Sequence, residues 1–249
     1  METKRKILVL ARHGMTPEGA NNSISYDAVI PESIERLAQS GYEHLFDFVN
    51  GQGITYHQAF LTHSEKKRTL YTGKAILSGA FDIKPRPTSQ EEADNISFGE
   101  LEIEKDARLD YEDLQINRDA AKRDGELVYL TNWMANPESN SYEGLSITPF
   151  NELVRSRRFC LANAINRLSS EKDLGILVTH CAIAEPIAIS IVNSARKNPV
   201  KSFEEIGGLF DKEDFATLII DYNQKSGLVE ARFVRKDREY KVNLQNLRD

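Results

Sequence analysis

Short apolar runs of strand length alternate with longer amphipathic segments along most of this 249-residue chain. Uninterrupted apolar runs are typical of parallel strands that are buried on both faces. The segments between them carry apolar residues at helical spacing, and the last two runs read as an antiparallel pair. The predicted strands cover residues 6–11, 59–62, 174–179, 215–222 and 228–234, and the predicted helices cover 31–50, 65–77, 148–168 and 183–195. This order predicts an α/β fold of three layers, α/β/α, with a mainly parallel sheet.

Residues 91–143 interrupt the alternation. The stretch is heavily charged from residue 100 to residue 126, and helical patches occur only around 109–122 and 127–134. We interpret it as an insertion in a single domain that spans 1–249, and a polar linker is the alternative. Trp133 lies in this stretch, where packing is favoured over a role in a substrate lid.

Charge and composition exclude several classes of function. The sequence has 32 Lys and Arg against 38 Asp and Glu, so the formal net charge is −6. This balance argues against the broad basic face of a nucleic-acid-binding protein but allows a small basic pocket. No apolar run is long enough for a secretory signal or a membrane span, and the two cysteines, Cys160 and Cys181, are too few for a disulfide framework. We therefore expect a cytoplasmic protein that contacts neither nucleic acid nor membrane.

Three polar clusters stand where predicted strands end. Arg12-His13-Gly14 follows the first strand, residues 64–68 follow the second, and His180 follows the third. Because ligands of open α/β sheets bind outside the carboxyl ends of the strands, these clusters are expected to meet in one pocket. Two arginines and two histidines there indicate phosphate chemistry, since a guanidinium matches phosphate oxygens bidentately and a neutral imidazole can attack phosphorus.

The same three clusters resemble the motifs of a known family. Residues 12–16 read Arg-His-Gly-Met-Thr, residues 64–73 read Ser-Glu-Lys-Lys-Arg-Thr-Leu-Tyr-Thr-Gly, and residues 176–180 read Ile-Leu-Val-Thr-His. In this order and approximate spacing they resemble the histidine phosphatase superfamily, which includes the cofactor-dependent phosphoglycerate mutases. The resemblance covers residues 6 to about 195 and implies a phosphoglycerate mutase-like fold with the helical insertion over the active-site face.

The resemblance also implies roles for individual residues. His13 would be the nucleophile that forms a phosphohistidine, and Arg12, Arg68 and His180 would make the phosphate pocket. Thr16 and Asn22 are expected to line the pocket and bind substrate. Neither a metal nor another cofactor is expected, because the arginines and the second histidine supply the charge stabilisation.

The general acid is the part of the pattern that this sequence does not match. Relatives place a Glu four residues before the Gly of a Phe/Tyr-Gly pair, and here Phe98-Gly99 is preceded at that position by Asn95. The adjacent Asp94 is our prediction for the acid. The other candidates are Glu92, Glu102 and Glu185.

We expect a phosphatase that hydrolyses a small soluble phosphate monoester. One alternative is a phosphoglycerate-type mutase, although the mutase segment around the acidic Glu is absent. Another is a protein that binds phosphate or a phosphorylated partner without turnover. A homodimer is left open.

Overall fold

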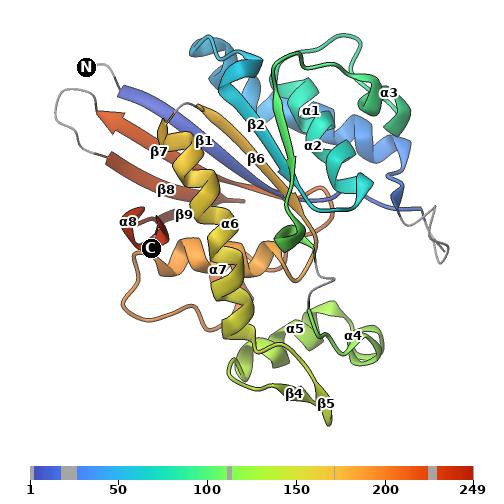
Figure 1. Cartoon of the computed structure of the whole chain (residues 1–249), viewed down its shortest axis with the longest axis vertical. Coiled ribbons are helices and arrows are strands. Elements are labelled where there is room, and N and C mark those ends of the chain that lie inside the picture. Colours follow the sequence, from blue (N-terminus) through green and yellow to red (C-terminus); the bar gives the residue numbers. More distant parts are fainter. Residues whose placement is uncertain (1–2, 18–26, 111–113, 171, 224–228, 249) are drawn as a thin grey trace.

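The computed structural model describes residues 3–17, 27–110, 114–170, 172–223 and 229–248. Its centre is a seven-stranded sheet of order β3-β2-β6-β1-β7-β8-β9 (Figure 1). The strands are β1 (Thr3–Arg12), β2 (Ala59–His63), β3 (Glu102–Lys105), β6 (Leu174–Thr179), β7 (Phe215–Asn223), β8 (Val229–Arg235) and β9 (Arg238–Lys241). Strands β1, β2, β3 and β6 are parallel, whereas β7, β8 and β9 are antiparallel to their neighbours. The predicted, mainly parallel α/β architecture is therefore confirmed.

Helices cover both faces of the sheet. Helices α1 (Pro31–Gly51) and α2 (Lys67–Ala80) pack on one face, and α6 (Phe150–Ser170) and α7 (Ala184–Asn193) pack on the other. Because side chains alternate along a strand, β1 supplies both cores. Its Leu8 and Leu10 face α6 and α7, while Ile7, Val9 and Ala11 face α1 and α2. The central strand is thus held from both sides, and its carboxyl end is fixed.

Helices α1 and α2 approach each other through two glycines. A Cβ atom at Gly41 would overlap the backbone of Ile76, and one at Gly79 would overlap the backbone of Ala38. Both positions therefore need glycine for the two helices to pack at this distance. This contact lies in the last turns of α2, and Arg68 stands at the other end of the helix, in its first turn.

The predicted insertion is only partly separate from the sheet. It contains α3 (Gln90–Asn95) and the edge strand β3, and then α4 (Arg118–Asp124) and α5 (Glu126–Ala135), followed by the hairpin of β4 (Ser141–Tyr142) and β5 (Leu145–Ser146). Figure 1 shows α4, α5 and the hairpin beyond the ends of the parallel strands, beside the first half of α6. Trp133 is buried there, and its Nε1 donates to Thr148 O at 2.8 Å, so packing is its observed role.

Two short elements complete the described chain. Strand β9 borders β8, and helix α8 (Gln245–Arg248) packs beside α6. Among the helices described, none combines the length and apolar character needed to cross a membrane.

Candidate active site

His13 lies immediately after β1, on the loop that enters the strand-end region. Its backbone N–H donates to Thr179 O at 3.0 Å, which ties the loop to the end of β6. The next residue must be glycine, because a Cβ at Gly14 would lie 2.5 Å from Ser33 Oγ. The Gly14 N–H donates to Thr72 Oγ1 at 2.9 Å, so α2 also holds the loop. Three elements therefore fix the backbone that carries His13.

The His13 ring is held in one tautomer. Nδ1 lies 2.7 Å from Gly14 O, and only a protonated Nδ1 can donate to a carbonyl oxygen. The lone pair is therefore on Nε2. Burial, together with the nearby Arg68 guanidinium, lowers the pKa of His13 to about 3, so the imidazole is neutral at ordinary pH. A neutral, oriented imidazole is the form required of a nitrogen nucleophile.

His180 follows β6 and faces His13. The two ring centroids are 5.0 Å apart, and the rings are inclined at 62°. Arg68 Nη2 donates to His180 Nδ1 at 3.2 Å, so Nε2 carries the proton and donates to Ser64 Oγ at 2.8 Å. Burial and the neighbouring His13 and Arg68 lower the pKa of His180 well below 6.5. The structure thus brings together the second histidine and the second arginine that the sequence singled out.

Arg12 is 8% exposed and is positioned by a relay from α7. Its Nη1 donates to Phe210 O at 2.7 Å, and the N–H of Phe210 donates to Glu185 Oε1 at 2.9 Å. The other carboxylate oxygen of Glu185 accepts the N–H of Ala182 at 2.9 Å. Glu185 is fully buried, and burial raises its pKa. This carboxyl group joins the loop after His180 to the segment that holds Arg12.

Two lysines add positive charge at the edge of this pocket. Lys212 Nζ lies 3.4 Å from Thr16 Oγ1, and its charge contributes to the lowered pKa of His13. Lys66 contributes in the same way to the lowered pKa of His180. Within the described part of the chain, no group of three His, Cys, Asp or Glu side chains is arranged to hold a metal ion. Arg12 and Arg68, together with the two lysines, act electrostatically on the histidines.

Comparison with known proteins concerns the fold. No protein-family model and no curated protein sequence matches the chain. A solved structure described as mycobacterial hydrolase 1 is 15% identical, with a TM-score of 0.50 over 94% of this chain and 99% of that one. The chain shares the α/β/α fold of this structure. The resemblance of the sequence motifs to the histidine phosphatase superfamily stays a prediction, and the similarity to this structure concerns the fold.

Two further solved structures are similar to this chain, with lower TM-scores. A mycobacterial glucosyl-3-phosphoglycerate phosphatase is 16% identical, with a TM-score of 0.48 over 96% of this chain and 100% of that one. A phosphoglycerate mutase from Bacillus anthracis is 10% identical, with a TM-score of 0.46 over 98% of this chain and 96% of that one.

The carboxyl groups predicted as acids lie in different surroundings. Asp94, at the end of α3, pairs with Lys74 at 3.3 Å, and its side chain is 53% exposed. Glu92 accepts the N–H of Thr88 at 2.7 Å. Glu102 begins the edge strand β3 and pairs with Arg167 at 2.8 Å. Each of these three carboxylates is thus bonded to a neighbour, and none of the three contacts is to His13 or His180.

Two predicted substrate-binding residues remain predictions. Thr16 lies beside Lys212, as described above, and is half-buried. Asn22 lies outside the described residues.

Asp110 is the carboxyl group that sequence reasoning missed. It follows β3 and the 3-10 turn Ala107–Leu109, is 1% exposed, and has Oδ2 3.9 Å from His180 Nε2. Thr179 Oγ1 donates to Leu109 O, which anchors this turn to the end of β6. Asp110 comes five residues after the last residue of β3, whereas His13 and His180 follow their strands directly, so its position in the sequence gave no matching signal. Strand β3 itself is exposed, so no apolar run marks it in the sequence.

Proposed function

We propose that this protein is a phosphatase that hydrolyses a small phosphate monoester through a phosphohistidine on His13 Nε2. The observation that carries the proposal is the hydrogen bond from His13 Nδ1 to Gly14 O, made inside a cluster that also holds Arg68 and His180. The bond leaves Nε2 unprotonated and oriented, and the cluster supplies donors for a phosphoryl group. We propose a cytoplasmic location on the sequence grounds given above.

In the first step, His13 Nε2 gives its lone pair to phosphorus, and the bond from phosphorus to the ester oxygen breaks. Arg12 and Arg68 bind the phosphoryl oxygens as charge shifts among them, and His180 assists from the opposite side. The two guanidinium groups are rigidly held, so little reorganisation is needed during the reaction. The products are a phosphohistidine and an alcohol.

We assign the proton for the leaving oxygen to Asp110 in place of Asp94. The support is geometric, since Asp110 Oδ2 lies beside His180 whereas Asp94 pairs with Lys74. In the second step, the Asp110 carboxylate takes a proton from water as the water oxygen attacks phosphorus. The bond from nitrogen to phosphorus breaks, and inorganic phosphate leaves with His13 neutral again.

The proposal is tested by turnover and by trapping the intermediate. The wild-type protein is expected to hydrolyse p-nitrophenyl phosphate between about pH 5 and 8. After incubation with an ester labelled in its phosphate group and denaturation without acid, labelled phosphate is expected to stay covalently bound to the protein. His13→Ala is expected to lower kcat by about 10³-fold or more and to remove the label, because it deletes the nucleophile.

His57→Ala is the matched control, since its side chain is 70% exposed and pairs with Glu100 on the surface. If neither the wild-type protein nor His13→Ala hydrolyses any ester of a broad panel, binding without turnover would be favoured. Phosphoryl transfer between positions of phosphoglycerate, dependent on bisphosphoglycerate, would favour a mutase.

A further inference from the structure

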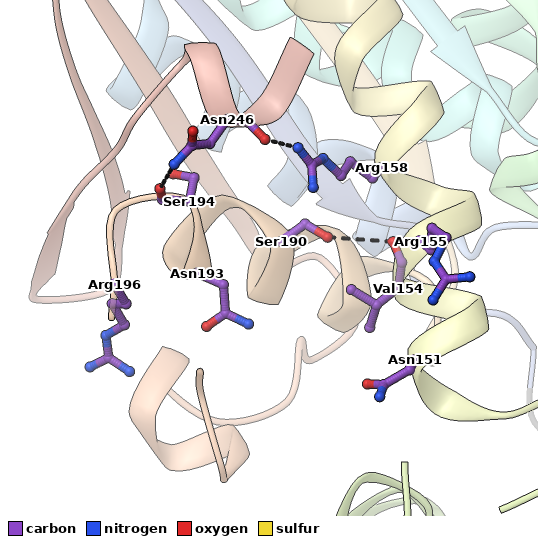
Figure 2. A pocket seen from close by; sticks show the side chains of 9 residues that line it. All are labelled: Asn151, Val154, Arg155, Arg158, Ser190, Asn193, Ser194, Arg196 and Asn246. Carbon is purple, nitrogen blue, oxygen red and sulfur yellow. Dashed lines mark hydrogen bonds between the residues drawn. The ribbon is translucent and has the colours of Figure 1, made fainter. Parts of the chain in front are cut away.

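A second basic region lies in a groove between α6, α7 and α8 (Figure 2). The residues that line it are Asn151, Val154, Arg155, Arg158, Ser190, Asn193, Ser194, Arg196 and Asn246. On α6 the lining positions follow helical spacing, so they form one face of the helix. Helix α7 begins beside His180 and ends at this groove, so its ten residues, about 15 Å long, separate the groove from the candidate active site.

The groove is cationic on an acidic protein. Three of its nine lining residues are arginines, and none of the nine is acidic, although the whole chain carries a net charge of −6. Lys197 and Lys201 are exposed in the loop that also carries Arg196 and add to the positive charge of this region. Of these cations, Arg196 pairs with Glu205 at 2.6 Å. Positive charge therefore exceeds negative charge here.

The groove is also braced, so its cations are presented on a defined surface. Arg158 donates to Asn246 O, which joins α6 to α8. Asn193 Oδ1 accepts the N–H of Val200 at 2.7 Å and holds the loop that carries Arg196. Figure 2 shows Arg155 on the α6 wall and Arg196 on the opposite wall, beyond the end of α7.

The negative end of α7 does not cancel this charge. Ser194 Oγ donates to Ile191 O at 2.7 Å, and Asn246 Nδ2 donates to Ser194 O at 2.6 Å. Protein donors thus already bond these two terminal carbonyl oxygens, where a helix carries partial negative charge. The full charges of the arginines dominate the groove.

We propose that this groove binds a short acidic peptide segment of a partner protein. Arg155 and Arg158 stand on the α6 wall and Arg196 on the opposite wall, so the guanidinium groups do not converge on one point. This spacing suits carboxylates along a chain better than a single phosphate. Val154 supplies an apolar surface between them for an aliphatic side chain. A long nucleic acid would run beyond the groove onto a net negative surface and be repelled. The proposal is independent of the phosphatase chemistry.

The test uses the full chain and a fluorescein-labelled peptide of about ten residues in which Glu alternates with Leu and Gly. Fluorescence anisotropy is expected to show saturable binding, and replacing every Glu with Gln is expected to weaken it by about tenfold or more. Arg155→Glu is expected to weaken binding of the acidic peptide by about tenfold while leaving hydrolysis of p-nitrophenyl phosphate unchanged.

Lys84→Glu is the matched control, because it makes the same change in net charge at an exposed side chain just after α2, the helix on the other face of the sheet. Equal weakening by Lys84→Glu, or equal binding of the Glu and Gln peptides, would overturn the proposal. So would displacement of the peptide by inorganic phosphate or by a short oligothymidylate at the peptide's own concentration. Loss of peptide binding in a folded, active Arg155→Glu variant supports it.

Discussion

The pocket at the strand ends and the groove beside α6 are both basic, yet they hold their cations in opposite ways. In the pocket, Arg12 is 8% exposed and Arg68 is 2% exposed, and each guanidinium donates to a fixed acceptor of the protein. In the groove, Arg155 is exposed and Arg196 is 37% exposed. The same residue type is therefore buried and rigid in one region and solvated in the other.

The difference in burial changes what an arginine can do. Two unit charges 4 Å apart interact by about 1 kcal/mol in water but by about 4 kcal/mol at the effective dielectric of a partly buried site. A buried, oriented guanidinium can therefore stabilise charge that shifts during a reaction. An exposed guanidinium is screened by salt and retains side-chain motion, so it suits reversible recognition. Burial thus supports the proposal of catalysis for the pocket, and exposure supports the proposal of partner binding for the groove.

Carboxyl groups should show the largest effect of this contrast. Asp110 is 1% exposed beside His180, whereas the Asp94 side chain is 53% exposed beside Lys74. We expect Asp110→Asn to lower kcat on an alkyl phosphate by about 10²- to 10³-fold, and much less on p-nitrophenyl phosphate, whose leaving group needs no proton. Asp94→Asn is expected to stay within about twofold on both. Steady-state kinetics on the two esters measures this, and a reversed pattern would return the role to Asp94.

A smaller effect is expected when an arginine becomes a lysine in each region. Lysine keeps the charge but loses the planar fork of donors. Arg68→Lys should therefore lower kcat/KM by about 10²-fold, because Arg68 must bond His180 and bind phosphate at once. Arg155→Lys should change the affinity for the acidic peptide by no more than about twofold. Comparable losses in the two variants would contradict the distinction between the pocket and the groove.

Much of this arrangement is visible in the sequence because burial leaves a pattern. The strand predicted over 174–179 is observed as Leu174–Thr179, and the helix predicted over 31–50 is observed as Pro31–Gly51. Continuous apolar strands and long one-sided helices are the elements whose periodicity is strongest. Since polar residues that end such strands meet at one edge of the sheet, the sequence alone predicts that His13 and His180 lie near each other, as the structure has them.

The missed features lack that pattern for physical reasons. Strand β3 is exposed at all four residues, so no apolar run marks it, and Asp110 lies beyond a further 3-10 turn that the sequence pattern does not show. The 4-residue elements β9 and α8 are shorter than the window over which periodicity can be seen. The groove forms only where α7 ends beside the polar face of α6, and that face reads as solvated in the sequence alone. The position of Asp110 beside His180 and the groove beside α6 both arise from tertiary contacts, which leave no periodic pattern in the sequence.

Burial of His13 should also make the fold sensitive to acid. The pKa of this histidine is about 6.5 in an unfolded chain and about 3 in the folded protein, so the unfolded chain binds the proton first. Its contribution to stability is therefore fully present above about pH 6.5 and is lost as the pH falls toward 3. At pH 5 the loss relative to pH 7 is about 2 kcal/mol for this one group.

Replacing the histidine tests this smallest effect, which corresponds to about 30-fold in the unfolding equilibrium. Urea unfolding at pH 7 and pH 5, followed by circular dichroism, should show that His13→Gln loses about 2 kcal/mol less than the wild-type protein between the two values. His180 remains in the variant, and because its pKa is also lowered by burial, the variant is still expected to be less stable at pH 5 than at pH 7. The exposed His57 serves as the control, and His57→Gln should lose as much stability as wild type. Equal losses of stability in His13→Gln and wild type would mean that the pocket does not hold His13 neutral. The distinction between the buried pocket and the exposed groove would then be contradicted.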